Sequence, residues 1–151
     1  MGDGSDGLAE GEVVLLRVRA GAIADAGSWV YVWCRVDGDR RVVYVGATGL
    51  HPATRTWLHL HDPDPAVGRV SALLPSAATD PLDVVAMRVP PEGSRPQTKA
   101  AVIARLGQEG LLSDDDVGDA PPTLSDACPA SIRSAELLAE KVAAHIAAGA
   151  S

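Results

Sequence analysis

Alternation of apolar and polar residues predicts two adjacent strands in the first half of the chain. Residues 30–36 are rich in β-branched and aromatic residues, and residues 41–45 read as the returning strand. Asp37-Gly38-Asp39 between them supplies residues that tolerate the positive φ angles of a hairpin turn. Gly46 is expected to end the second strand, where the backbone bends sharply or lets another group approach closely.

A helical pattern follows the hairpin. Pro52 suits a first helical position, and Arg55 and His59 share one helical face because four residues separate them. Apolar spacing predicts further elements: a strand over 12–19 at an edge of the sheet, helices over 66–74 and 96–106, a strand over 81–89 and a closing helix over 131–148. The closing helix is expected to turn five apolar residues inward: Ile132, Leu137, Leu138, Val142 and Ile146.

Together these elements predict an α/β fold of the α+β type. A small, mostly antiparallel three-stranded sheet is flanked by helices, with an extra N-terminal strand and a C-terminal helix. We expect a disordered N-terminus over 1–11, one domain over 12–108, and an acidic loop with the closing helix over 109–151, packed on the same domain. No apolar run approaches the ~20 residues of a membrane span, and the N-terminus lacks a signal region. A cytoplasmic protein without membrane contact is therefore expected.

The alternation of side chains along a strand indicates which candidate catalytic residues lie on the same face of the sheet. If the hairpin register allows, Tyr31 and Tyr44 lie on one face of the sheet, with Val42 beside Tyr44. The helix carrying Arg55 and His59 would lie next to them. Phenol and imidazole groups can move protons, and a guanidinium can hold a phosphate through two hydrogen bonds. The simpler interpretation is that both tyrosines only pack while Arg55 and His59 are solvated.

These residues resemble the GIY-YIG nuclease superfamily, whose two short motifs lie on adjacent strands. Trp29-Val30-Tyr31 corresponds to the first motif and Tyr44-Val45-Gly46 to the second, and Arg55 lies near the position of the family's catalytic Arg. The resemblance covers roughly residues 29–106. It implies that the tyrosines and the Arg position and activate the scissile phosphate and the attacking water. It also implies one divalent metal ion, Mg²⁺ or Mn²⁺, bound by a Glu on a later helix.

The chain departs from this family pattern at several positions. Trp29 replaces the Gly of the first motif, and Lys99 stands where the metal-binding Glu is expected. Shifting the frame two residues back gives Gln97, which is not an acid, and the chain contains no Asn, which many relatives use late in the domain. A metal ion would then need a carboxylate from elsewhere, and the candidates are Asp80, Asp83 and Glu92.

Three functions follow as alternatives. In a divergent GIY-YIG phosphodiesterase or endonuclease, Tyr31 or Tyr44 acts as or positions the base, Arg55 holds the phosphate and His59 assists proton transfer. In a repurposed, metal-independent enzyme on a small-molecule substrate, Lys99 supplies a cationic or nucleophilic group. In an inactive binding module, the fold serves contacts alone. Two further residues are assigned to substrate binding: Gly46 and Thr48.

Charge limits the choice of partners. The chain carries a net charge of −7, but residues 28–107 contain nine Lys and Arg against seven Asp and Glu, a net +2. This permits binding of a nucleic acid or a phosphate-containing small molecule, although it is far from the basic stripe of a strong DNA binder. The acidic flanks offer a surface for a protein partner.

The remaining metal and thiol candidates favour structural roles. His59 and His61 would point about 200° apart on a helix, which does not suit a shared zinc ion with His51. The Asp114-Asp115-Asp116 run reads as a solvated loop or a helix start. Cys34 shares its strand face with valines and is expected to be buried packing.

Overall fold

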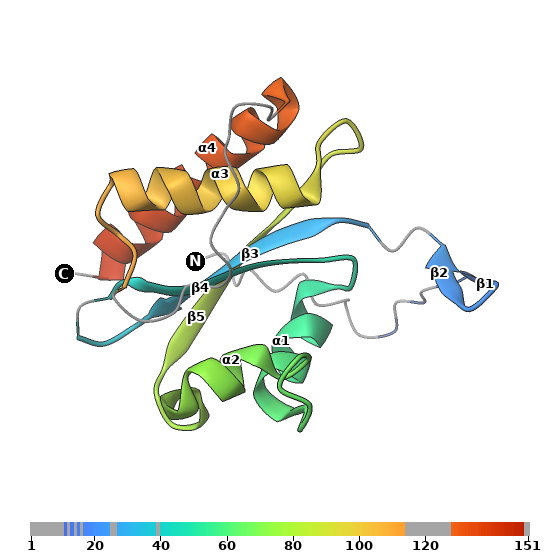
Figure 1. The fold of residues 1–151 in the computed structure, drawn as a ribbon, viewed down its shortest axis with the longest axis horizontal. Coiled ribbons are helices and arrows are strands. Elements are labelled where there is room, and N and C mark those ends of the chain that lie inside the picture. The colour runs from blue at the N-terminus through green and yellow to red at the C-terminus, as the bar shows by residue number, and fades with distance from the viewer. Residues whose placement is uncertain are drawn as a thin grey trace.

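A three-stranded antiparallel sheet lies at the centre of the fold, in the strand order β4-β3-β5 (Figure 1). The computed structural model describes residues 11, 13, 15, 17–24, 27–38, 40–113 and 128–149. The sheet strands are β3 (Trp29–Arg35), β4 (Val42–Thr48) and β5 (Leu82–Arg88). This arrangement confirms the predicted α+β fold. The predicted disorder before residue 11 and the Asp114–Asp116 run lie outside the described residues.

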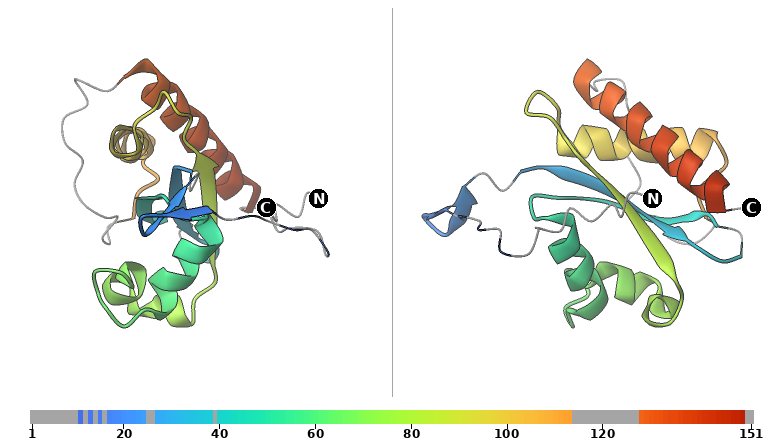
Figure 2. Two further views of the ribbon diagram at one scale, coloured as in Figure 1. Left: turned by 90° about the vertical axis from the view of Figure 1, so that its right-hand side faces the viewer. Right: turned by 180° about the vertical axis from the view of Figure 1, so that it is seen from behind.

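Helices cover both faces of this sheet, as Figures 1 and 2 show. On one face lie α1 (Pro52–His61), the short α2 (Arg69–Leu73) and the 3₁₀ helix η1 (Pro75–Ala78). On the other lie α3 (Arg95–Gln108) and α4 (Pro129–Gly149). The helix predicted over 66–74 is shorter than expected, because Val67 and Gly68 bond back to the Asp64 carbonyl in a turn that precedes α2. None of the helices in the described part of the chain combines the length and apolar character needed to cross a membrane.

The N-terminal strand is present, but it does not extend the sheet as an edge strand. Within the described residues, β1 (Arg17–Arg19) pairs only with β2 (Ala22–Ala24) in a separate two-stranded sheet. Ala20 and Gly21 both have positive φ, of 51° and 78°, which is the backbone of a tight hairpin turn. This turn folds the strand back on the next three residues, and the sequence pattern did not predict that partner.

A β-bulge interrupts the pairing of β3 with β4. Trp33 pairs with Tyr44, whereas the next residue, Cys34, pairs with Val42, so Val43 is the extra residue. Val42 therefore packs on the α3 side of the sheet, while Val43 and Tyr44 both pack on the α1 side. The expectation that Val42 lies beside Tyr44 is wrong, because the bulge breaks the period of two at this point.

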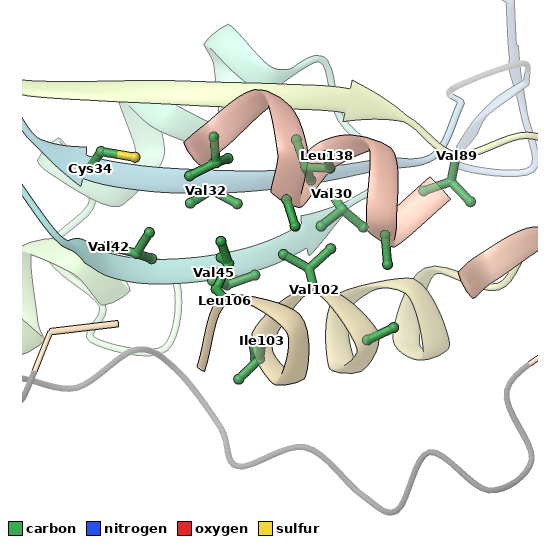
Figure 3. Packing of buried hydrophobic residues seen from close by; sticks show 14 residues of the cluster. Val30, Val32, Cys34, Val42, Val45, Val89, Val102, Ile103, Leu106 and Leu138 are labelled. Carbon is green, nitrogen blue, oxygen red and sulfur yellow. The ribbon is translucent and has the colours of Figure 1, made fainter. Parts of the chain in front are cut away.

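An aliphatic core fills the space between the sheet and helices α3 and α4 (Figure 3). Val30, Val32 and Val45 point from the strands toward Val102 and Leu106 of α3, and all five are fully buried. Leu138 of α4 completes this layer. The valines suit a pleated strand and leave little space to fill, so α3 packs directly on the sheet.

Helix α4 meets this core through small residues. Ala135, Ala139 and Val142 are buried along its inner face, whereas Ile132 and Leu137 are 39% and 47% exposed. The expectation that Ile132 and Leu137 point inward is wrong. Alanines on the inner face let α4 approach α3 closely, and this packing sets the rotation of the helix against the apolar pattern.

Cys34 lies in the aliphatic core and is 1% exposed, as predicted. Burial, with a smaller contribution from Asp83, raises the pKa of its thiol to about 12. A hydrogen bond with Ser131 instead lowers the pKa of the Cys128 thiol. At neutral pH we expect an Ellman-type reagent to titrate one thiol in the native protein and a second only after denaturation. A Cys128→Ser variant should lose the fast phase; loss of that phase in Cys34→Ser instead would contradict this assignment.

Candidate functional site

The face of the sheet opposite the aliphatic core carries an aromatic core. It consists of Tyr31, Trp33, Val43, Tyr44, Val70 and Ala77. His59 of α1 is fully buried among its rings, with ring centroids 5.5 Å from Tyr31, 5.7 Å from Trp33 and 5.2 Å from Tyr44. The two tyrosine rings lie 6.4 Å apart. The structure thus brings together both predicted tyrosines and the predicted histidine.

Hydrogen bonds fix the orientation of the His59 ring. Its Nδ1 accepts the Val70 backbone N–H at 3.3 Å, so in the neutral ring the proton resides on Nε2. Nε2 lies 2.6 Å from the Tyr31 hydroxyl and therefore donates to the phenolic oxygen. Tyr31 then keeps its own proton for another acceptor. His59 holds Tyr31 in place as a hydrogen-bond donor.

Burial sets the protonation states of this pair. It lowers the pKa of His59 to about 4, with further lowering by the positive charges of Arg55 and Arg69. Burial also raises the pKa of Tyr31, assisted by Tyr44 and opposed by the same two arginines. At neutral pH the imidazole is uncharged and the phenol is protonated. The site is therefore a neutral hydrogen-bonded pair beside two guanidinium groups.

Gly46 allows Tyr31 to lie flat across the neighbouring strand. The two residues are directly paired in the sheet, and a Cβ at Gly46 would overlap the hydroxyl and ring of Tyr31. Gly46 does not end its strand as expected, because β4 continues to Thr48. The close approach that the glycine permits is that of the Tyr31 ring.

Arg55 and Arg69 reach the site from α1 and the start of α2. The Arg55 guanidinium donates through Nη1 to the Val67 carbonyl oxygen at 2.8 Å and lies beside the Tyr31 phenol. Arg69 was missed by the sequence interpretation, which read this stretch only for its apolar residues. The available signal was its position directly before Val70, the buried residue of α2.

Two other predicted site residues lie apart from this cluster or serve local structure. The Thr48 hydroxyl accepts the Leu50 N–H at 3.0 Å and so stabilises the turn into α1. Lys99 is half-buried on α3, the helix that covers the opposite face of the sheet (Figure 2).

The described residues at the site do not fit a divalent metal. The side chains around Tyr31 and His59 are phenols, arginines and an imidazole whose two nitrogens are both engaged. Within the described ranges, no group of three or more His, Cys, Asp or Glu side chains could hold a metal ion. Of the carboxylates considered from the sequence, Asp83 instead bonds His145 at 2.7 Å, and Asp80 is exposed.

Comparisons with known proteins identify no relative of this chain. The sequence matches no protein-family model, and searches of curated proteins and of solved structures find no similar protein.

Proposed function

We propose that the chain is a divergent phosphodiester hydrolase of the GIY-YIG type. The observation that carries the proposal is the 2.6 Å hydrogen bond between Tyr31 and His59 with the Arg55 guanidinium beside the phenol. A guanidinium next to a protonated phenol provides a phosphate ligand and a proton donor in one place.

The order of the elements supports this proposal. The first motif lies on β3 and the second on the adjacent antiparallel β4, and the Arg-bearing helix α1 follows directly. A third strand, β5, pairs with the other side of β3, and α3 comes next. This is the arrangement that the resemblance implies.

Each residue then has a defined part in the reaction. Arg55 binds a non-bridging phosphate oxygen and offsets the charge that builds up on it. Water attacks the phosphorus while the bond from phosphorus to the leaving oxygen breaks. Tyr31, whose protonated form burial favours, donates its proton to the leaving oxygen, and the proton released by the attacking water restores the phenol. His59 positions Tyr31 through its Nε2–H. The described residues do not fit a metal ion, so the proposed reaction uses none.

The Arg55→Ala variant tests this function. We expect DNA cleavage to fall by about 100-fold or more, because a single charged donor aimed at the transition state contributes on that scale. Supercoiled and single-stranded DNA are incubated with the purified protein, with and without Mg²⁺ or Mn²⁺, and circular dichroism checks the fold. Arg133→Ala, on the exposed side of α4, serves as the matched control. Unchanged DNA cleavage by Arg55→Ala would contradict the proposed function.

Burial favours one alternative, an inactive binding module. His59 is fully buried and Tyr31 is 2% exposed, so the pair can also serve packing alone. A binding module predicts no turnover by the wild-type protein on any phosphodiester, together with a stable partner in a pull-down. An enzyme built on Lys99 receives less support, since α3 places that residue across the sheet from the Tyr31–His59 pair.

A further inference from the structure

One short segment, residues 67–70, forms hydrogen bonds with two side chains of α1, Arg55 and His59. The carbonyl oxygen of Val67 accepts from Arg55, and the N–H of Val70 donates to His59. Gly68 between them packs so closely on the Asp62 carbonyl that a Cβ there would overlap it. Arg69 is therefore held between two backbone anchors, next to the site.

Arg69 and Arg55 act on the same two groups. Arg69 directly precedes Val70, whose N–H bonds the His59 ring, and Arg55 bonds the Val67 carbonyl two residues before Arg69. In agreement with this placement, both arginines lower the pKa of His59 and favour the phenolate form of Tyr31. Tyr31 and His59 are themselves neutral at pH 7. Two positive charges converging on a neutral donor pair form an environment that favours an anion.

We propose that Arg69 is a second phosphate-binding residue that grips, together with Arg55, the phosphoryl group presented to the Tyr31 hydroxyl. This inference rests on the proposed function and deepens it. Two planar guanidiniums offer several N–H donors to the phosphoryl oxygens. They supply at this site the positive charge that a divalent ion supplies in the family that the chain resembles.

Inorganic phosphate is the probe, titrated in the presence of EDTA. Binding is followed by NMR through the His59 ring signals in the wild type, Arg69→Gln, Arg69→Lys and the control Arg133→Gln. We expect Arg69→Gln to weaken the phosphate Kd by about tenfold or more, since a charge-assisted hydrogen bond is lost. Arg69→Lys should fall between, because an ammonium keeps the charge but not the planar donor array. Arg133→Gln should bind as the wild type does.

The His59 titration separates phosphate binding from a purely structural role. Loss of the Arg69 charge should raise the pKa of His59 from about 4, and saturating phosphate should raise it in the wild type but less in Arg69→Gln. If Arg69→Gln binds phosphate as tightly as the wild type, the inference is overturned. If Arg69→Gln does not fold, Arg69→Lys provides the test. The inference is overturned if Arg69→Lys binds phosphate with wild-type affinity and its His59 pKa responds to phosphate as in the wild type.

Failure of this inference is distinguishable from failure of the proposed function. Weakened phosphate binding by Arg69→Gln supports the inference even if the wild-type protein cleaves no DNA. Cleavage that depends on Arg55, combined with phosphate binding that is indifferent to Arg69, overturns the inference and leaves the hydrolase in place.

Discussion

Replacing Gly46 with Ala is expected to cost about 3 kcal/mol of folding stability and to break the Tyr31–His59 hydrogen bond. The new methyl group would overlap the Tyr31 hydroxyl and come within 2.7 Å of its Cε2. Tyr31 is 2% exposed and packed against His59 and Tyr44, so its ring has little room to move aside. Overpacking of this kind typically costs about 1–3 kcal/mol, and a rigid buried ring places it at the upper end.

Urea denaturation of Gly46→Ala measures this effect. Gly107→Ala is the matched control, because Gly107 lies in α3 and a Cβ there would meet only Leu112 at 3.4 Å. That variant should be neutral or stabilised, as expected for Gly to Ala in a helix. In a Tyr31→Ala background, where the ring is absent, the Gly46→Ala substitution should cost much less stability than it does in the wild type. If Gly46→Ala is as stable as the wild type, the Tyr31 ring does not lie where the structure places it.

Acidification from pH 6.5 to pH 4 is expected to remove about 3 kcal/mol of stability through His59 alone. Its pKa is about 4 in the folded protein against the ordinary 6.5 of an exposed histidine. Over this interval the unfolded chain binds a proton that the folded chain does not, so stability falls as pH falls. At about 1.4 kcal/mol per pH unit the full interval would give about 3.5 kcal/mol, and partial protonation at its two ends reduces this to about 3 kcal/mol. The loss ends near the folded pKa.

The free energy of unfolding, measured by denaturant at pH values between 7 and 4, tests this dependence. His59→Gln cannot titrate, so its stability should change less over this range than that of the wild type. His145→Gln, which removes a half-exposed histidine paired with Asp83, is the control for loss of a histidine outside the site. An equal pH dependence in wild type and His59→Gln would show that another group is responsible.

Strand periodicity predicted the face of Tyr31 correctly, because β3 is regular and alternates cleanly between the two cores. It failed for Val42, because the extra residue Val43 moves Val42 to the other face of the sheet from Tyr44. A pattern of apolar and polar positions does not reveal this extra residue, because Val42 and Val43 are both apolar. The prediction that Tyr31 and Tyr44 share one face was conditional on register. Tyr31 pairs with Gly46 and Trp33 with Tyr44, so the bulge, which lies before Tyr44, leaves both tyrosines on that face.

Features set by tertiary packing were the ones the sequence did not reveal. Arg69 lies next to the site because the turn after α1 brings α2 back against α1. The spacing of residues within either helix does not reveal this contact. In α4, Leu137 is the stronger apolar residue, yet Ala135 is buried, because close contact with α3 favours the smaller side chain. Similarly, Gly46 was correctly read as a point of close approach, but the approaching group could be named only from the fold.

The separation of aromatic from aliphatic residues by the sheet has an optical consequence. Trp29 and Trp33 point to the α1 side of β3, and Trp57 lies on α1 itself. Tyr31 and Tyr44 lie on the same side, and the chain has no Phe. The intrinsic fluorescence of this protein therefore reports on the half that holds the candidate site. The aliphatic half, where α3 and α4 supply the longest helices, is instead visible chiefly through the far-ultraviolet signal of the backbone.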